Sequence, residues 1–374
     1  MGLLIGLLSV VAAAGLPESY LVRVEGTVGL CRHDVAAMKA PAEQAAARLA
    51  AGGAFWAGGQ RSWVSELSGR AGGFMMIKGL GDQTPAPEDV VLFAPDAGAG
   101  VPGPLVESGA LVVLFGSCPS GIGAPCFSNH AEEGDVSPTL ANAIPAWVFT
   151  GELVAALTRL GKMPVMYESI GAYGGYARMR QYDNGKIAFH DDRDVPAVEA
   201  GVLGNRFLDR VGAMLKRIEK EERADLDRAG AWAREAKAAG NALVMYSMGH
   251  LFPDEVGKTA IGRLFRSAVW NAGFPHHAKP NDAYTPGDLV VCIGYQHPPD
   301  VLLRRARPAG ARVVYVTVRS DRDYVRDEDV MWIDPMWDWP DACVELDGYD
   351  IPILAASGIV NGAIAWEIYR LASQ

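Results

Sequence analysis

The sequence predicts an α/β protein with two similar domains, each a parallel sheet between two layers of helices. Three observations predict this fold class. Short, continuously apolar segments alternate with helical segments, which is typical of strands buried on both faces of a parallel sheet. The same landmarks recur in the same order in both halves of the chain, which indicates an internal repeat. The length of 374 residues also favours two domains over one.

The composition is that of a globular protein and excludes several classes of function. Hydrophobic residues make up 49% of the chain and charged residues 21%, which fits neither a disordered chain nor a polytopic membrane protein. The chain carries 34 Lys and Arg against 44 Asp and Glu, a net charge of −10. Since no basic patch stands out, we expect no nucleic-acid partner. Five scattered cysteines without CxxC spacing predict neither a zinc site nor a disulfide framework.

The N-terminal residues 1–20 resemble part of an export signal. Leu3–Ala14 is an apolar run that ends in three alanines, and Pro17 breaks it shortly afterwards. No Lys or Arg precedes the run, as one normally would in a signal peptide. A run of about a dozen residues is too short to span a bilayer. The segment is therefore either an export signal or a buried N-terminal helix, so export and a cytoplasmic location both stay open.

The first landmark is a helix, a buried strand and a glycine-rich turn. A Pro-led, Ala-rich helix is expected over Pro41–Ala51 and ends at Gly52. Gly53–Ser62 then predicts a short buried strand that enters a glycine-rich turn, and Trp63–Arg70 predicts the next helix. This order of elements is the beginning of a βαβ unit.

The second half repeats this landmark. A long helix is expected over about Arg206–Ala239 and ends at Gly240. Asn241–His250 again predicts a strand that enters a glycine turn, and a helix is expected over about Pro253–Ala272. The two halves therefore begin in the same way.

The second landmark is a pair of further strands in each half. Asp89–Pro95 and Asp288–Gly294 are apolar runs that follow a Pro-containing turn. Gly109–Phe115 and Gly310–Val316 predict the next strand in each half. A short helix between the two strands completes a βαβ step in both halves.

The third landmark is a terminal helix in each half. Asp135 and Glu152 in the first helix have the same spacing as Asp350 and Glu367 in the second. The two segments therefore align without a gap, which completes the repeat.

Two short motifs resemble the sugar isomerase (SIS) domain family. Gly58–Arg70, GGQRSWVSELSGR, resembles the glycine turn and following helix of phosphoheptose isomerases, and Tyr246–Gly257, YSMGHLFPDEVG, resembles the Gly-His turn of a related branch. The resemblance implies a doubly wound, flavodoxin-like fold that binds phosphorylated sugars at the carboxyl ends of its strands. It implies a first SIS-like domain over residues 21–170, a connector over 171–204 and a second SIS-like domain over 205–374.

The resemblance also implies candidate acid–base groups. An aldose–ketose isomerisation needs a base that moves a proton between adjacent carbons. Glu66 aligns with a catalytic or metal-binding glutamate of phosphoheptose isomerases, and Glu255 is its counterpart in the second half. Alternatively, each glutamate only stabilises the start of its helix. His250 and His297 are expected at the same edge of the sheet as an acid–base pair or, alternatively, as separate solvated residues.

The expected ligand contacts lie in the glycine turns. The first turn contributes Gly59, Gln60, Arg61, Ser62 and Ser65, and the second contributes Gly249.

The two loops that carry hydroxyl residues in the family contain Asp96 and Asp300 here, and these carboxylates repel phosphate. An unphosphorylated ligand, or none in one copy, is therefore favoured. We expect any phosphosugar to bind only through the first copy, with Arg61 or Arg70 offsetting its charge.

Two hypotheses of function follow. The first is a sugar or sugar-phosphate isomerase that acts by proton transfer, and the second is a non-catalytic carbohydrate-binding or regulatory module. Both imply a small-molecule sugar as partner, with the ligand at the junction of the two domains. No cofactor or metal is expected, since no dinucleotide fingerprint or metal motif is found. Association into a homo-oligomer is possible for either.

Overall fold

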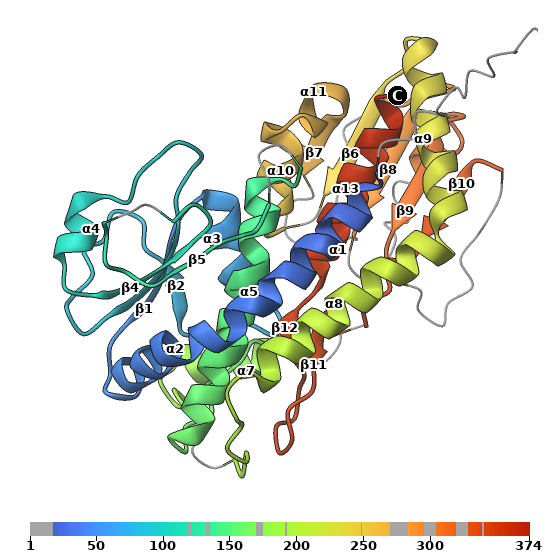
Figure 1. Cartoon of the computed structure of the whole chain (residues 1–374). Coiled ribbons are helices and arrows are strands. Elements are labelled where there is room, and N and C mark those ends of the chain that lie inside the picture. The colour runs from blue at the N-terminus through green and yellow to red at the C-terminus, as the bar shows by residue number, and fades with distance from the viewer. Residues whose placement is uncertain are drawn as a thin grey trace, which may run out of the picture.

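Two five-stranded parallel sheets flanked by helices form the body of the molecule, which confirms the predicted fold class (Figure 1). The structure is a computed structural model, and it describes residues 18–118, 121–131, 135–169, 175–190, 193–247, 249–269, 283–294, 304–318, 328–338 and 340–374. His297 and Asp300, together with most of the signal-like N-terminus, lie outside these described residues.

The first sheet has the strand order β2-β1-β3-β4-β5. Its strands are β1 (Phe55–Gly59), β2 (Ile77–Gly79), β3 (Val90–Ala94), β4 (Leu111–Phe115) and β5 (Cys126–Phe127). All neighbouring strands are parallel, and Phe55 of β1 is paired with Val90 of β3. β3 and β4 are buried along their whole length, as their uninterrupted apolar sequences predict.

The second sheet has the same strand order when it is followed from β7. Its strands are β6 (Leu243–Ser247), β7 (Arg266–Val269), β8 (Leu289–Ile293), β9 (Arg312–Val316) and β10 (Val330–Ile333). They are arranged β10-β9-β8-β6-β7, and all pairs are parallel. Both sheets therefore have the 2-1-3-4-5 order of flavodoxin-like folds. A separate antiparallel pair is formed by β11 (Ala342–Val344) and β12 (Ile353–Ala355).

The long helices join the two sheets into one body. Figure 1 shows α5 (Pro138–Arg159) and α13 (Ser357–Ala372) between the sheets, with α1 (Tyr20–Cys31) and α8 (Val202–Glu221) across them. α1 packs against α8 and α13, whereas α8 packs against α5. A continuous apolar core includes side chains from all of these helices and from the inner faces of both sheets.

An aspartate precedes β3 in the first sheet and β8 in the second, and its carboxylate binds the backbone at the start of the neighbouring strand. The Asp89 carboxylate accepts hydrogen bonds from the backbone N–H groups of Ala54 (2.8 Å) and Ala86 (2.9 Å). The Asp288 carboxylate accepts one from Ala242 (2.8 Å) in the same way. These two carboxylates fix the start of β1 to β3 and the start of β6 to β8, and they are the aspartates that open the second landmark of the predicted repeat.

Several expected helices have different bounds in the structure, and the helix expected over Trp63–Arg70 is α3 (Arg61–Leu67). Pro41 lies inside α2 (Val35–Ala50), which follows the short helix η1 (Arg32–Asp34), instead of leading the helix. The long helix expected over Arg206–Ala239 is divided into α8 and α9 (Arg223–Ala238), with Glu222 between them.

The prediction of a single helix over Pro253–Ala272 is wrong. The segment forms α10 (Phe252–Lys258), α11 (Ile261–Leu264) and then strand β7, up to the last described residue of the range. β7 pairs with β6, so completion of the sheet outweighed the local helical pattern. The remaining helices are α3 (Arg61–Leu67), α4 (Gly103–Glu107) and α7 (Tyr176–Asp183).

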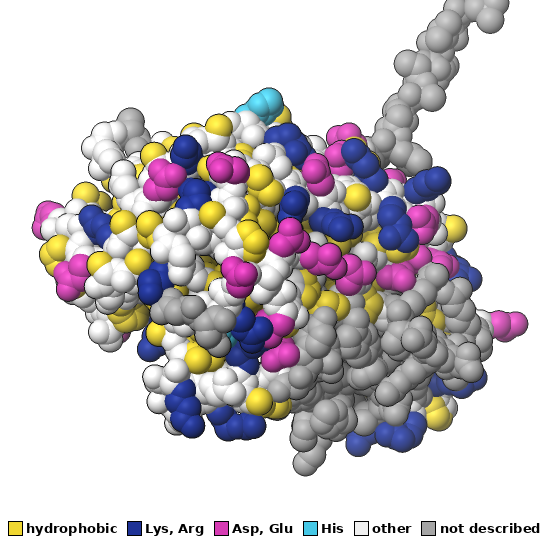
Figure 2. All heavy atoms as spheres, turned by 90° about the horizontal axis from the view of Figure 1, so that it is seen from below, with side chains coloured by type: hydrophobic (Ala, Val, Ile, Leu, Met, Phe, Trp, Pro, Cys, Tyr) yellow, Lys and Arg dark blue, Asp and Glu magenta, His cyan; other side chains and the backbone are white. Residues whose placement is uncertain are grey.

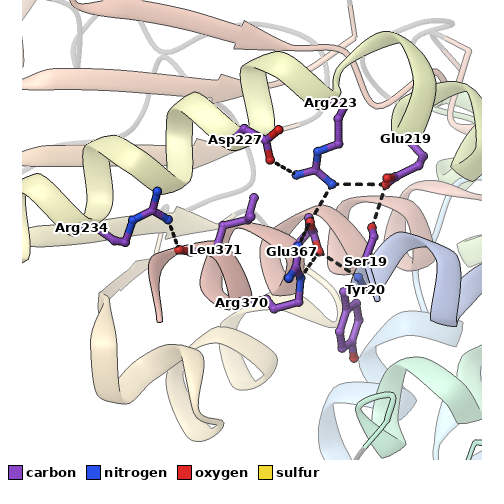
Figure 3. A network of polar contacts seen from close by, with 9 residues as sticks. All are labelled: Ser19, Tyr20, Glu219, Arg223, Asp227, Arg234, Glu367, Arg370 and Leu371. Atoms are coloured by element: carbon purple, nitrogen blue, oxygen red, sulfur yellow. Dashed lines mark hydrogen bonds and ion pairs between the residues drawn. The ribbon is translucent and has the colours of Figure 1, made fainter. Parts of the chain in front are cut away.

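A buried ionic network attaches α1 and α9 to α13 (Figure 3). The Glu367 carboxylate is fully buried and accepts a hydrogen bond from the backbone N–H of Tyr20 at the start of α1 (2.8 Å). Arg223 and Arg370 each donate to the same carboxylate at 2.7 Å. In the first half, the Glu152 carboxylate accepts hydrogen bonds from the N–H groups of Gly201 and Gly204 at the start of α8.

The longest helix of the described part of the chain, α5, is strongly apolar. Among the described residues, α5 is the one helix whose length and hydropathy would suit a membrane span. All of its most apolar stretch is buried inside the protein, as in the core helix of many globular proteins.

A disulfide joins Cys118 to Cys126 across the loop between β4 and β5, contrary to the expectation of no disulfide framework. Cys31, Cys292 and Cys343 are buried and are not part of this disulfide. Sequence spacing did not indicate this pair, because β5 brings Cys126 alongside the end of β4 only once the sheet has formed.

Acidic and basic side chains are mixed on the surface. On the described part of the face shown in Figure 2, Lys and Arg are interspersed with Asp and Glu and do not form a continuous basic stripe. A continuous basic stripe is the electrostatic feature of nucleic-acid-binding proteins. The described part of this face therefore carries no such feature.

Candidate functional site

The first glycine turn is held tightly against β3. Gly59 has a φ of 94°, and a Cβ atom there would lie 1.9 Å from the carbonyl oxygen of Ala94. Only glycine fits this approach. The backbone N–H of Gln60 donates to the same oxygen (2.8 Å), and the Gln60 side chain donates to the carbonyl of Pro95 (3.1 Å). Gln60 therefore holds the turn in place from a buried position.

A cavity of about 430 Å³ lies beside this turn. Its walls come from β1, the start of α3, the loop after β2, and the segment that leads into α4. The lining residues are Ala57, Gly58, Gly59, Arg61, Val64, Leu80, Gly81, Asp82, Gln83, Thr84, Pro85, Phe93, Pro102, Pro104 and Leu105. A cavity of this size with mainly apolar walls and a few polar groups is typical of a small-molecule site.

Two of the predicted ligand contacts, Gly59 and Arg61, line this cavity, and others do not. The Ser62 hydroxyl is buried and faces Thr139 at 3.5 Å. The carbonyl of Ser65 accepts a hydrogen bond from His250. Asp96 is exposed and does not line the cavity, so its carboxylate does not directly oppose an anion there.

The loop Gly81–Pro85 and the segment Pro102–Leu105, which line the cavity, were not predicted from the sequence. β2 has only three residues, and Gly79 is the last of them, so periodicity did not reveal the strand that precedes the first loop. The adjacent Thr84 and Pro85 were a usable signal of a polar loop at the edge of the sheet.

Glu66 lies in a closed ionic cluster between the two halves of the chain. Its side chain is fully buried and accepts a hydrogen bond from the Trp147 indole at 3.3 Å. The guanidinium Nη2 of Arg70 lies 3.6 Å from Oε1 of Glu66 and 3.3 Å from Oδ2 of Asp341. The same nitrogen donates a hydrogen bond to the hydroxyl of Ser357. Arg70 is therefore enclosed and cannot offset the charge of a ligand in the cavity.

Burial raises the pKa of Glu66 to about 7. Arg70 and the Trp147 hydrogen bond oppose this rise, whereas the Asp341 carboxylate adds to it. α13 also approaches closely, because a Cβ atom at Gly358 would lie 2.0 Å from a Glu66 carboxylate oxygen. Glu66 is thus a titrating group at the point where α3 meets α13.

His250, which follows Gly249 in the second glycine turn, reaches α3 of the first half. Its Nδ1 lies 3.1 Å from the carbonyl oxygen of Ser65. Because that oxygen can only accept, Nδ1 carries the proton. Burial and then the nearby charge of Arg70 lower the pKa of His250 to about 3, so the imidazole is neutral at ordinary pH.

Glu255 has the same type of partners as Glu66. Its carboxylate accepts a hydrogen bond from the Trp366 indole at 2.7 Å, as Glu66 does from Trp147. Burial raises its pKa against hydrogen bonds from Ser137, Trp366 and Thr139. Each glutamate therefore contacts the terminal helix of its own half and the start of the terminal helix of the other half. The expected pairing of His250 with His297 lies partly outside the described residues.

No cluster of three or more His, Cys, Asp or Glu side chains within the described ranges has an arrangement that could hold a metal ion. Of the described cavity-lining side chains, only Arg61 and Asp82 are charged. Arg61 can donate hydrogen bonds to an anion or a hydroxyl group, and Asp82 can accept them from a hydroxyl or an amide group.

No protein-family model matches the sequence, and no curated protein matches it. Among solved structures, the chain is similar to the C-terminal domain of glucosamine-fructose-6-phosphate aminotransferase from Francisella tularensis, with a TM-score of 0.52 and 10% identity over 96% of this chain and 97% of that chain. The chain shares the fold of that domain. The resemblance to SIS domains is therefore supported at the level of the fold.

Two further solved structures resemble the chain. A candidate phosphosugar isomerase from Silicibacter pomeroyi DSS-3 has a TM-score of 0.48 and 13% identity, over 95% of this chain and 97% of that chain. A candidate sugar-binding protein from Salmonella typhimurium LT2 has a TM-score of 0.49 and 12% identity, over 94% of this chain and 98% of that chain.

Proposed function

We propose that the protein binds a sugar or sugar phosphate in the cavity beside β1. The observation that carries this proposal is a set of polar side chains around an apolar floor. Arg61, Asp82, Gln83 and Thr84 line the cavity, and none of these side chains makes a hydrogen bond or ion pair with another described residue. A guanidinium group without a partner is available for a phosphate or carboxylate.

The shared fold supports the same proposal. The solved structure with a TM-score of 0.52 carries glucosamine and fructose 6-phosphate in its name. In doubly wound α/β folds, ligands bind outside the carboxyl ends of the strands. The cavity lies at this edge of the first sheet, because Gly58 and Gly59 are the last two residues of β1.

We propose binding without isomerisation at this cavity. A general base must come within hydrogen-bonding distance of the proton that it removes. Glu66 and His250, the two leading acid–base candidates, do not line the cavity, and both are engaged between the halves of the chain. The protein is then a carbohydrate-binding or regulatory module.

The second candidate function is an isomerase in which Glu66 transfers the proton. One observation favours it: burial brings the pKa of Glu66 to about 7, near the value that suits a general acid–base group. In this case substrate would have to reach the cluster that contains Arg70 and Asp341.

Calorimetry with glucose 6-phosphate and fructose 6-phosphate tests the proposal. We expect both to bind the wild-type protein, and Arg61→Ala to weaken binding by about tenfold or more, since a charge-assisted contact is lost. Arg263→Ala, which removes an exposed arginine of α11, is the matched control and should bind normally. Binding that is unchanged in Arg61→Ala would contradict the proposed site. Interconversion of the two sugars by wild-type protein, lost in Glu66→Gln, would favour the isomerase instead.

A further inference from the structure

The cavity opens onto a small apolar cluster that is separate from the main core. This second cluster covers the outer face of the first sheet and contains Leu80, Val91, Phe93, Leu105, Val112 and Leu114. Alternate residues of β3 and β4 belong to it, whereas the residues between them belong to the main core. The two clusters therefore lie on opposite faces of the sheet.

The outer face of the first sheet is covered by a short helix and loops, whereas longer helices pack on the inner face. α2, α3 and α5 pack on the first sheet and shield its inner face. The helix that contributes to the outer cluster is α4, which has five residues and supplies Leu105. Figure 1 shows α4 on the side of the sheet away from α5 and α13. Within the described part of the chain, loops and the short helix α4, and no long helix, therefore cover the apolar side chains beside the cavity.

The floor of the cavity is apolar and closely fitted. Phe93, Leu80 and Leu105 line it and are almost fully buried. A Cβ atom on Gly58 would lie 2.9 Å from the Phe93 ring and 3.2 Å from Leu80, so β1 leaves room only for glycine beside this floor. A sugar that carries only hydroxyl groups would place some of them against these side chains without hydrogen-bond partners, at a cost in free energy.

The polar groups of the cavity come from two other segments. Arg61 is contributed by α3, and Asp82, Gln83 and Thr84 by the loop after β2. The Arg61 guanidinium can donate to an anionic group, whereas the Asp82 carboxylate can only accept, and it suits an amide N–H or a hydroxyl group of the same ligand. A ligand that satisfies both the polar groups and the floor needs an anionic group, hydrogen-bonding groups and one apolar substituent. An amide-linked acyl group supplies hydrogen bonds at its amide and an apolar end beyond it.

We propose that the ligand of this cavity is an anionic N-acyl amino sugar, with its anionic group on Arg61 and its acyl group on the floor formed by Phe93, Leu80 and Leu105. This inference rests on the proposed function, and it names the class of sugar that the same cavity selects.

Calorimetry on the full chain tests the inference with glucose 6-phosphate, N-acetylglucosamine 6-phosphate, N-propionylglucosamine 6-phosphate and N-acetylglucosamine. We expect the N-acetyl phosphosugar to bind at least tenfold more tightly than glucose 6-phosphate. The N-propionyl compound should bind about fourfold more tightly again, which corresponds to one more buried methylene. N-Acetylglucosamine, which lacks the anion, should bind at least tenfold more weakly than its phosphate.

The outcomes separate the two proposals. Equal affinity for glucose 6-phosphate and the two N-acyl compounds would overturn the inference and leave the proposed function standing. No binding of any of the four compounds would overturn both. Tighter binding of neutral N-acetylglucosamine than of its phosphate would overturn the role of Arg61.

A variant of the floor locates the acyl group. Leu105 is the floor residue contributed by α4, and Leu105→Ala removes most of its apolar side chain. We expect it to weaken binding of the N-acyl compounds at least threefold more than binding of glucose 6-phosphate. Val106→Ala, at the neighbouring exposed position of the same helix, is the matched control. An N-acyl advantage that survives in Leu105→Ala would overturn this placement.

Discussion

At the scale of single residues, the buried Glu66 and the partly buried His250 are two groups whose titrations have opposite effects on stability. Burial raises the pKa of Glu66 from 4.5 to about 7, so the folded protein retains a proton that the unfolded chain has lost. Stability from this group is fully present below pH 4.5 and is lost as the pH rises to about 7. Burial and Arg70 lower the pKa of His250 from 6.5 to about 3, and stability from this group increases over pH 3–6.5.

We therefore predict that Glu66→Gln changes the slope of stability against pH. The variant keeps the acceptor for Trp147 but cannot titrate, so its free energy of unfolding relative to wild type should rise by up to about 3 kcal/mol between pH 4.5 and 7.5. Thermal and urea unfolding at intervals of half a pH unit measure this difference. Glu107→Gln, at an exposed position, is the control. A constant difference between variant and wild type over this range would show that Glu66 does not titrate there.

The complementary prediction concerns His250. It has a φ of 55°, and Asn is a residue that adopts this left-handed conformation comparatively readily, so His250→Asn is the least disruptive substitution. We expect the variant to lose the rise in stability over pH 3–6.5, because Asn has no proton to exclude. Unfolding measured from pH 3.5 to 7 checks it. A wild-type slope in His250→Asn would assign the rise to another group.

At the scale of elements, the two terminal helices hold the first turns of helices distant in sequence. Glu367 of α13 accepts from Tyr20 at the start of α1, and Glu152 of α5 accepts from Gly201 at the start of α8. Such a carboxylate satisfies N–H groups that have no partner inside their own helix.

We predict that Glu367→Ala destabilises the protein by about 3–5 kcal/mol, because it leaves a buried N–H group and two arginines, Arg223 and Arg370, without their shared acceptor. Asp227→Ala removes an exposed partner of the same Arg223 and should cost less than about 1 kcal/mol. Guanidinium denaturation of both variants measures the two values. Equal effects would show that the buried position of Glu367 adds nothing to its contribution.

At the scale of the whole molecule, the two halves share one core. α1 packs on α13 of the second half, and α8 packs on α5 of the first, so neither sheet keeps its cover without the other half. Glu66 and Glu255 extend this dependence, since each contacts both terminal helices.

We predict that the chain unfolds in one cooperative transition. Far-UV circular dichroism and tryptophan fluorescence should give coincident denaturation curves, as a two-state unit requires. A ligand in the cavity of the first half, such as glucose 6-phosphate, should shift the whole transition upward and not only part of it. Two separated transitions, or a ligand shift confined to one of them, would show that the halves fold independently.

Sequence alone determined the class of the fold and the position of its main turns. The continuous apolar runs at β3, β4, β8 and β9 predicted parallel strands, because a strand covered on both faces has no polar side. The glycine turns could also be predicted from the sequence, because a tight turn often needs a residue that tolerates a positive φ. Gly59 adopts a φ of 94°, which few other residues tolerate. The break between α8 and α9 and the strand β7 were not predicted, because completion of helix packing and of the second sheet outweighed the local pattern.

Only the tertiary structure decided which residues of Gly58–Arg70 face a ligand and which face the other half. Helical periodicity shows that α3 has a buried side but not what covers it. Arg61 and Val64 line the cavity, whereas Glu66 is held together with Arg70, whose hydrogen-bond partner Ser357 is 287 residues away in the chain. Contacts over such separations depend on how the two sheets pack around α5 and α13, and no local pattern of residues encodes that packing.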